Sequence, residues 1–474
     1  MSNKNRWWNR PVIVVPILTL VLVGTLTFLP GGCTPHIAYR VPNWSIETSI
    51  ERMQADMAHS KEVGRHSVEV HDEFTLGFVE FDDQGDYFTE TQLQRLLETL
   101  DQEASRQGRS GLLTVVFVHG WKHNASVCDQ NVACFREILR SLENLERLGA
   151  YAADQPPRRV VGVYLGWRGL SIEPGPLRNL SFYARKQVAH RVGSGRLREV
   201  LIRLEAHRDR LDDETGRPSR VVVVGHSFGG AVVYSALSGL LHDRAMRSFI
   251  EATEGGGGGG IETFCDLAVL VNPAFEASLY AGLHELGRSR EKYSQQQPTV
   301  LLTVGSESDS ATGVWFPIGR RFATLLEKTR DAEQRKALRT TLGNYLPYRT
   351  HEARVASARG SFLGDVQEIG ADEARGESDC RCDYIATQSL DEQRIRSLVD
   401  FRTVSLDAFR DDEDRWLFGN VELAPVSDEI DPHLPFFVVG ASDEIVTEHN
   451  GIYNEVFVDF LRAFLLEMER RRER

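Results

Sequence analysis

One stretch near the middle of the chain restricts the possible folds more than any other feature. Residues 220–233 read Arg-Val-Val-Val-Val-Gly-His-Ser-Phe-Gly-Gly-Ala-Val-Val. The valines do not alternate with polar residues, so they predict a strand that is buried on both faces. The small residues after Ser227 fit a helix, and Gly225 and Gly229 allow strand and helix to approach closely. The stretch therefore predicts a sharp strand-to-helix turn with Ser227 at its apex.

A serine in such a turn is suited to nucleophilic catalysis. Residues 225–229 have the spacing Gly-x-Ser-x-Gly of a nucleophile elbow, which holds the serine hydroxyl at the N-terminus of a helix. Backbone N–H groups and the helix dipole stabilise developing negative charge there. With this motif between a strand and a helix, the chain resembles the α/β-hydrolase superfamily, and in particular its serine esterases and lipase-like members. The alternative is a tight turn in which Ser227 has only a structural role.

The resemblance implies an oxyanion hole that is built from two segments of the chain. The apolar stretch 112–118 is followed by His119-Gly120-Trp121. In the superfamily, the loop after this strand carries a His-Gly pair, and the next residue donates a backbone N–H. The implied donors are Trp121 and Phe228, the residue after the nucleophile. We expect His119 to be structural, like His123. A further loop, Trp167-Arg168, is expected to pack into the protein, with a position lining the site as the alternative.

The resemblance also implies the positions of an acid and a base. The apolar stretch 299–304 precedes the loop in which the superfamily carries its acid, and Asp309 is our first choice there, with Glu307 second. His449 follows the last predicted strand, 434–440, where the superfamily carries its general base. The expected triad is therefore Ser227, Asp309 and His449, in that chain order. Asp443 lies in the same loop as His449 and remains a rival for the acid.

Apolar strands that alternate with helical stretches predict the fold class. They indicate an α/β protein with a mainly parallel twisted sheet and helices on both faces, as in the α/β-hydrolase fold. After a spacer, 34–65, we assign the core to 66–312 and 435–474, the latter holding the last strand, the histidine loop and a C-terminal helix. Within the core, the alternating stretch 66–82 predicts antiparallel edge strands. The charged insertion 313–434 shows no pattern of buried strands and is expected to form a cap over the site.

The first 33 residues are set apart from this fold. Basic residues precede an apolar run, 12–29, that leads to Cys33. Three interpretations stay open: a bacterial lipoprotein signal with lipid on Cys33, an uncleaved membrane anchor, or a cleaved secretory signal. Each of them excludes residues 1–33 from the fold and locates the catalytic part outside the cytoplasm, and the lipoprotein and the anchor locate it in the cell envelope. The first two also predict attachment to the membrane.

Charge and cysteine content narrow the possible partners. The net charge of −13 and the lack of a sustained basic stripe argue against nucleic acid. Cys128 and Cys134 are spaced to close a small disulfide loop, and Cys380 or Cys382 would then be left to reach Cys265; thiols throughout are the alternative. Cys380-Arg-Cys382 lacks a second pair at zinc spacing, so neither a metal nor an organic cofactor is implied.

These observations predict a serine hydrolase that cleaves a carboxylic ester, either a small molecule or a lipid, through an acyl-enzyme on Ser227. The same triad would also serve an acyltransferase, a thioesterase or a peptidase. A different class remains open as well, because a fold does not dictate a reaction: a catalytically silent hydrolase-fold protein that binds a partner in the cell envelope.

Overall fold

The structure is a computed structural model of the chain. It describes residues 34–41, 66–106, 108, 110–152, 156–171, 177–215, 219–253, 260–289, 293–356, 382 and 416–473. The N-terminal segment 1–33, with its three interpretations, and most of the spacer lie outside these residues. Within the described part of the chain, no helix combines the length and the apolar character needed to cross a bilayer.

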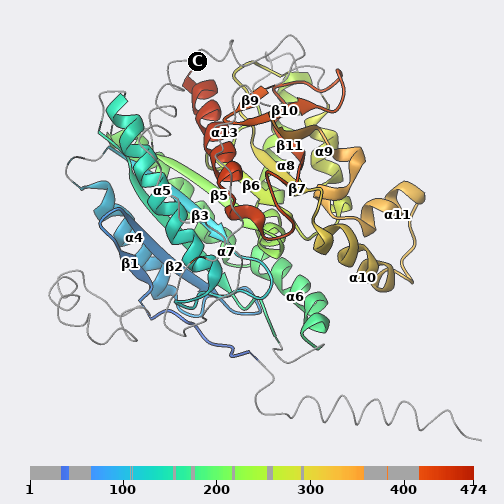
Figure 1. Cartoon of the computed structure of the whole chain (residues 1–474), viewed down its shortest axis with the longest axis horizontal. Helices are drawn as coiled ribbons and strands as arrows, with labels where there is room; N and C mark the ends of the chain where they lie inside the picture. Colours follow the sequence, from blue (N-terminus) through green and yellow to red (C-terminus); the bar gives the residue numbers. More distant parts are fainter. Residues whose placement is uncertain are drawn as a thin grey trace, which may run out of the picture.

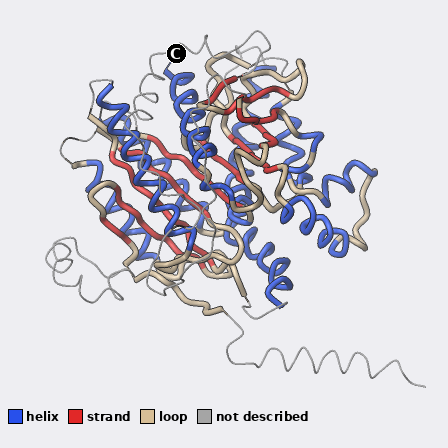
Figure 2. Tube along the Cα trace, viewed as in Figure 1, coloured by secondary structure: helices blue, strands red, loops and turns tan. Residues whose placement is uncertain are grey.

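An eleven-stranded sheet forms the centre of the molecule, in the order β1-β2-β4-β3-β5-β6-β7-β11-β8-β10-β9 (Figures 1 and 2). The strands from β2 to β8 in this order pair in parallel, whereas β1 at one edge and β10 and β9 at the other pair antiparallel. The strands are β1 (Val68–Val70), β2 (Phe74–Phe81), β3 (Leu112–Val118), β4 (Arg159–Trp167), β5 (Arg220–His226), β6 (Leu267–Val271), β7 (Leu301–Ser306), β8 (His351–Val355), β9 (Trp416–Phe418), β10 (Val421–Pro425) and β11 (Phe436–Ala441). The predicted fold class is confirmed.

Helices cover both faces of the sheet. Leu113 and Val115 of β3 face α5 and α13, while Leu112 and Thr114 face α4 and α7 on the other side. Because both faces are covered, the central strands carry continuous apolar runs. The α-helices are α4 (Glu90–Ala104), α5 (Gln130–Ala152), α6 (Leu177–Ser194), α7 (Leu197–Thr215), α8 (Phe228–Thr253), α9 (Ala281–Gly287), α10 (Phe316–Ala323), α11 (Ala332–Arg339) and α13 (Glu455–Glu473).

Strand β2 differs from the expectation of an antiparallel edge strand. It lies between β1 and β4, runs parallel to β4, and is buried along its whole length. Its polar residues are buried because each has a partner. The Thr75 hydroxyl donates to Glu103 at 2.8 Å, and the Glu80 carboxylate accepts backbone N–H groups at 2.8 Å. In the sequence, buried polar residues with hydrogen-bond partners give the same alternating pattern as polar residues on the solvent face of an edge strand.

The insertion 313–434 also differs from its expectation. It contributes β8, β10 and β9, which extend the sheet beyond β11, although its sequence shows no pattern of buried strands. These strands have three to five residues, and in β8 buried and partly exposed positions alternate. No long apolar run therefore marks them in the sequence. The helical part of the insertion, from the π-helical turn η2 (Ala311–Trp315) to α11, lies to one side of the sheet, near α6 (Figure 1).

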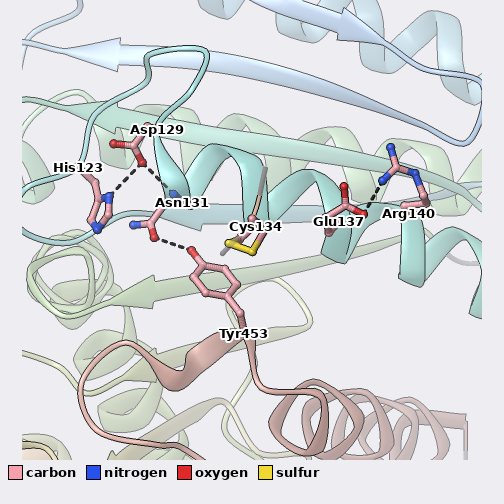
Figure 3. Close-up of a disulfide and its surroundings, with 8 residues drawn as sticks. His123, Asp129, Asn131, Cys134, Glu137, Arg140 and Tyr453 are labelled. Atoms are coloured by element: carbon pink, nitrogen blue, oxygen red, sulfur yellow. Dashed lines mark hydrogen bonds and ion pairs between the residues drawn. A yellow bond between two sulfur atoms is a disulfide. The ribbon is translucent and has the colours of Figure 1, made fainter. Parts of the chain in front are cut away.

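The cysteine pairing corrects the sequence prediction as well. Cys134 of α5 is bonded to Cys382, 248 residues away (Figure 3). Cys128 is disulfide-bonded too. The expected Cys128–Cys134 loop is wrong because α5 begins between the two cysteines and carries Cys134 into the buried layer. The buried Cys265 is outside any disulfide, so its proposed pairing with Cys380 or Cys382 is wrong. The Cys134–Cys382 bond ties the insertion to the core helix α5.

Removing this bond is expected to lower the stability of the protein. In a double variant, Cys134→Ser with Cys382→Ser, the unfolded chain regains the freedom that a cross-link over 248 residues removes. The expected loss in the free energy of unfolding is about 2–5 kcal/mol. Urea denaturation of both proteins without reductant measures it. Cys265→Ala is the matched control, because it removes a buried thiol that forms no disulfide. An equal loss in both variants would contradict the assigned role of the cross-link.

Candidate active site

Ser227 stands at the turn between β5 and α8. Its φ is +57°, a left-handed conformation that costs free energy for a residue with a side chain. Glycine is required on both sides of the turn. A Cβ at Gly229 would lie 1.9 Å from the carbonyl oxygen of Val118, and one at Gly225 would lie 2.6 Å from the carbonyl oxygen of Gly229. The sequence therefore folds here into a strained turn that aims the serine hydroxyl outward from the strand end.

The three side chains of the expected triad meet at one edge of the sheet. The Oγ of Ser227 lies 2.8 Å from the Nε2 of His449, and the Nδ1 of His449 lies 2.8 Å from the Oδ2 of Asp309. These residues follow β5, β11 and β7, respectively. Because the strands are parallel, their carboxyl ends share one edge, where ligands bind in open α/β sheets. A continuous hydrogen-bond chain thus links serine, histidine and carboxylate.

Asp309 is buried, and its carboxylate is held by the residues that follow it. It accepts the N–H of Ala311 at 2.8 Å and the hydroxyl of Thr312 at 2.5 Å. Burial alone would raise the pKa of Asp309, but the hydrogen bonds from His449 and Thr312 outweigh it and hold the pKa below its usual value. The carboxylate is therefore ionised at neutral pH. It accepts a hydrogen bond from the Nδ1–H of His449, which leaves Nε2 able to accept a hydrogen bond from the hydroxyl of Ser227.

The other two candidate acids lie elsewhere in the same region. Asp443 accepts the hydroxyl of Ser308 and, at 3.4 Å, the N–H of Glu448. Glu307 forms an ion pair with Arg349 at 3.4 Å. Of the three carboxylates that the sequence offers, Asp309 alone is hydrogen-bonded to the imidazole of His449.

The backbone of His449 is held from two strand ends. Its carbonyl oxygen accepts the Nε2–H of His226 at 2.8 Å and the side-chain amide of Asn272 at 3.0 Å. Burial lowers the pKa of His226 to about 3, so the ring is neutral. Further along the loop, the Tyr453 hydroxyl donates to Asn131 of α5 at 2.7 Å (Figure 3). These contacts fix the position of the imidazole relative to Ser227.

Asn272 offers a test of this positioning. Its Nδ2 donates to the carbonyls of Glu448 and His449, at 3.1 and 3.0 Å, while its Oδ1 accepts the N–H of Ser306 at 2.7 Å. Asn272→Asp would oppose a carboxylate to two carbonyl oxygens and displace the histidine loop. We expect kcat on a soluble ester to fall about 10–100-fold.

The control for this variant is Asn454→Asp. Asn454 also donates to a carbonyl, that of Glu444 at 3.1 Å, but from a partly exposed position in the same connection between β11 and α13. We expect it to leave kcat within about twofold, because the contacts of His449 are untouched. An unchanged kcat in Asn272→Asp would show that this asparagine does not position the histidine.

The loop after β3 runs beside Ser227. A Cβ at Gly120 would lie 2.8 Å from the Cβ of Ser227, so only glycine permits this approach. Trp121 follows at once, and Phe228 is the first residue of α8, where the first N–H groups of a helix lack intrahelical acceptors. The two expected oxyanion donors thus belong to the backbone segments on either side of Ser227.

An aromatic group that the sequence did not reveal lies beside these segments. Phe182 of α6 packs against Trp121, with ring centroids 5.3 Å apart, and against Phe228, at 4.7 Å. The ring of Phe182 thus contacts the side chains of both residues whose N–H groups are the expected oxyanion donors. Phe182 is far from every recognisable motif, and only the packing of α6 over the start of α8 brings it here.

The remaining residues that the sequence singled out are structural, as expected. His119 is fully buried and stacks on Trp167, with ring centroids 5.6 Å apart. Burial lowers the pKa of His119 to about 4, and its neutral Nε2 accepts the backbone N–H of Trp167 at 3.1 Å. His123 is hydrogen-bonded to Asp129 at 3.0 Å. Arg168 forms an ion pair with Asp83, so the Trp167-Arg168 loop packs into the protein.

The mainly parallel sheet, the strained serine turn, and a serine, a carboxylate and a histidine in that chain order are typical of α/β hydrolases. The comparison with protein families agrees. Residues 115–449 match the model of the alpha/beta hydrolase family, so the chain belongs to that family.

Other comparisons add little to this assignment. No curated protein sequence matches the chain significantly. One solved structure, a Trichoderma reesei cutinase in complex with a phosphonate inhibitor, aligns with 46% of this chain and 74% of that chain, at 16% identity and a TM-score of 0.17. A likeness at this level supports no argument about this chain.

Proposed function

We propose that the chain is a serine hydrolase that cleaves carboxylic esters through an acyl-enzyme on Ser227. The observation that carries the proposal is the unbroken hydrogen-bond chain from Ser227 through His449 to the buried Asp309, with 2.8 Å on each side of the imidazole. A structural serine would not need a histidine whose other nitrogen faces an ionised carboxylate. The strained φ of Ser227 also favours a functional role.

The proposed reaction has two halves. His449 takes the proton of Ser227, whose Oγ attacks the ester carbonyl carbon, and the N–H groups of Trp121 and Phe228 stabilise the resulting oxyanion. When the intermediate collapses, the carbon–oxygen bond to the alcohol breaks, and His449 gives its proton to the leaving alcohol. In the second half, His449 takes a proton from a water molecule, whose oxygen attacks the carbonyl carbon of the acyl-enzyme. The bond between that carbon and the Oγ of Ser227 then breaks, His449 returns the proton to Ser227, and the carboxylic acid leaves. Asp309 stabilises the imidazolium in both halves.

A fluorophosphonate probe tests this proposal directly. The activated hydroxyl of Ser227 should attack the phosphorus and expel fluoride, leaving a stable phosphonyl ester that mass spectrometry locates on the peptide that contains residue 227. We expect stoichiometric labelling of the chain, and no labelling of Ser227→Ala or His449→Ala.

Ser235 provides the matched control. Its hydroxyl also lies 2.8 Å from a histidine nitrogen, the Nδ1 of His190, and burial lowers the pKa of that histidine to about 4. Among the residues that the structure describes, no carboxylate is hydrogen-bonded to His190 as Asp309 is to His449, so Ser235→Ala should label like the parent protein. Labelling at Ser235 instead of Ser227, or no labelling of the folded chain, would refute the proposal.

A further inference from the structure

A strip of large apolar side chains lies exposed on the helical segment that follows Asp309. In the turn η2, helix α10 and the turn after it, Leu326 is 93% exposed, Phe322 78% and Trp315 64%. Val314, Ile318 and Leu325 are exposed as well. Most of these residues are spaced three or four apart, so they form one side of the helical segment. Soluble proteins rarely expose so many large apolar side chains in one place without a binding function.

The opposite side of the segment is fixed to the body of the protein. Phe316 is buried, and Arg320 forms an ion pair with the buried Glu276 at 2.6 Å. Glu276 also pairs with Lys186 of α6, and a Cβ at Gly319 would collide with the ring of Tyr183 from the same helix. Because α10 is held by α6 and by this ionic cluster, the apolar strip faces outward in the folded protein.

The charge around the strip suits an anionic surface. Residues 316–336 contain six basic and three acidic side chains, whereas the whole chain carries a net charge of −13. Arg321 and Lys328 are exposed within or next to the strip. Aromatic and aliphatic residues flanked by basic ones are the composition of helices that lie in the headgroup region of a bilayer.

A second, independent observation concerns the beginning of the described chain. The N–H of Thr34 donates to the carbonyl of Ser171 at 3.0 Å, and Arg168 donates to the carbonyl of Thr34 at 3.2 Å. Ser171 follows the carboxyl end of β4. Since β4, β5, β7 and β11 are parallel, Thr34 is fixed at the edge of the sheet that carries the triad.

This position restricts how a membrane-attached protein would be oriented. A lipid on Cys33 would lie one residue from Thr34, and an anchor that ends at Leu29 would lie five residues away. At about 3.5 Å per residue, even the longer connection spans less than about 20 Å. Either form of attachment would therefore hold the active-site edge of the sheet close to the bilayer.

From these observations we infer that the apolar strip on η2 and α10 (Val314, Trp315, Ile318, Phe322, Leu325 and Leu326) docks on an anionic lipid bilayer, so that Ser227 acts on an ester that resides in the membrane. The substrate in this inference, a lipid ester, rests on the proposed function. The docking surface rests on the apolar strip. Asp309 and η2 are consecutive in the chain, so docking would bring the lipid surface next to the catalytic acid.

The test separates docking from catalysis. The chain of residues 1–474 is reconstituted into vesicles of phosphatidylcholine and phosphatidylglycerol, with a photo-cross-linking amino acid in place of Phe322 or, as a control, of Met246. Met246 is exposed on α8, away from the strip. We expect lipid adducts from the first position and not from the second. Adducts between two copies of the chain at Phe322, or no lipid adduct there, would overturn the inference, whether or not the protein is an enzyme.

Activity forms the second readout. Phe322→Glu with Leu326→Glu places two charges in the strip without touching buried residues. We expect hydrolysis of a long-chain ester in the vesicles to fall at least about tenfold, and hydrolysis of a soluble short-chain ester to stay within about twofold. Met246→Glu with Ile250→Glu, a matched exposed pair on α8, should alter neither rate.

Equal loss on both esters, or no loss on the vesicle ester, would contradict docking. If the parent protein hydrolyses neither ester, the proposed function fails, and the cross-linking result alone decides the inference.

Discussion

Replacing Ser227 by glycine is expected to abolish ester hydrolysis and at the same time to stabilise the protein relative to Ser227→Ala. Both variants remove the nucleophilic oxygen, so kcat should fall about 10⁴–10⁶-fold in each. They differ in the backbone. Residue 227 has a φ of +57°, which glycine adopts without strain and alanine does not. After the larger conformational freedom of unfolded glycine is subtracted, we expect Ser227→Gly to be about 1 kcal/mol more stable than Ser227→Ala.

Urea denaturation of the two variants side by side measures this difference, and a soluble ester measures the loss of activity. Ser235→Gly with Ser235→Ala is the control pair, because Ser235 lies within helix α8, where glycine is the less favourable residue. There the order of stability should be reversed. Equal stability of the two Ser227 variants would mean that a side chain at this position causes no backbone strain.

The second large effect concerns the acid. Asp309→Asn keeps the size of the side chain but removes its charge, so the imidazole of His449 is no longer held with its proton on Nδ1. We expect kcat to fall about 10⁴-fold. The free energy of unfolding should change much less, because the asparagine oxygen can still accept the backbone N–H groups of Ala311 and Thr312, and its amide can donate to the Thr312 hydroxyl. The measurement is steady-state hydrolysis of a soluble ester by the purified variant.

Asp443→Asn serves as the matched control, since Asp443 was the rival acid in the sequence. Its carboxylate accepts from Ser308 and Glu448 rather than from His449, so its replacement should reduce kcat by less than about tenfold. If Asp443→Asn caused the larger loss, the acid in the reaction would be Asp443, and the contact of 2.8 Å between Asp309 and His449 would be structural.

Much of the fold follows from simple patterns in the sequence. The valines before Ser227 and the apolar stretch 112–118 predicted buried parallel strands, because a strand covered on both faces has no polar side. The same logic located the loops after the strands, and the residues expected there, Ser227, Asp309 and His449, lie within hydrogen-bonding distance of each other in the structure. A local sequence pattern can therefore predict a site residue when that residue directly follows a predicted strand.

Such patterns could not predict contacts between segments that are distant in the sequence. Nothing near Asn272 or Phe182 marks either residue as part of the site, because their roles depend on the fold around them. The pairing of Cys134 with Cys382 depends in the same way on where the insertion returns to the core. The short strands β8, β9 and β10 escaped notice because their register comes from pairing with neighbours rather than from a local apolar run.

The pairing of β8 with β11 has a consequence for any shortened form of this protein. β11 precedes the histidine loop, and its outer side is hydrogen-bonded to β8 from the insertion at Val439, Gly440 and Ala441. Deleting the insertion would leave this strand as an open edge of the sheet, with unsatisfied backbone groups able to recruit the edge of another molecule. Truncated forms should therefore self-associate unless the deletion spares β8. The insertion thus also protects the protein from aggregation, in addition to any role beside the active site.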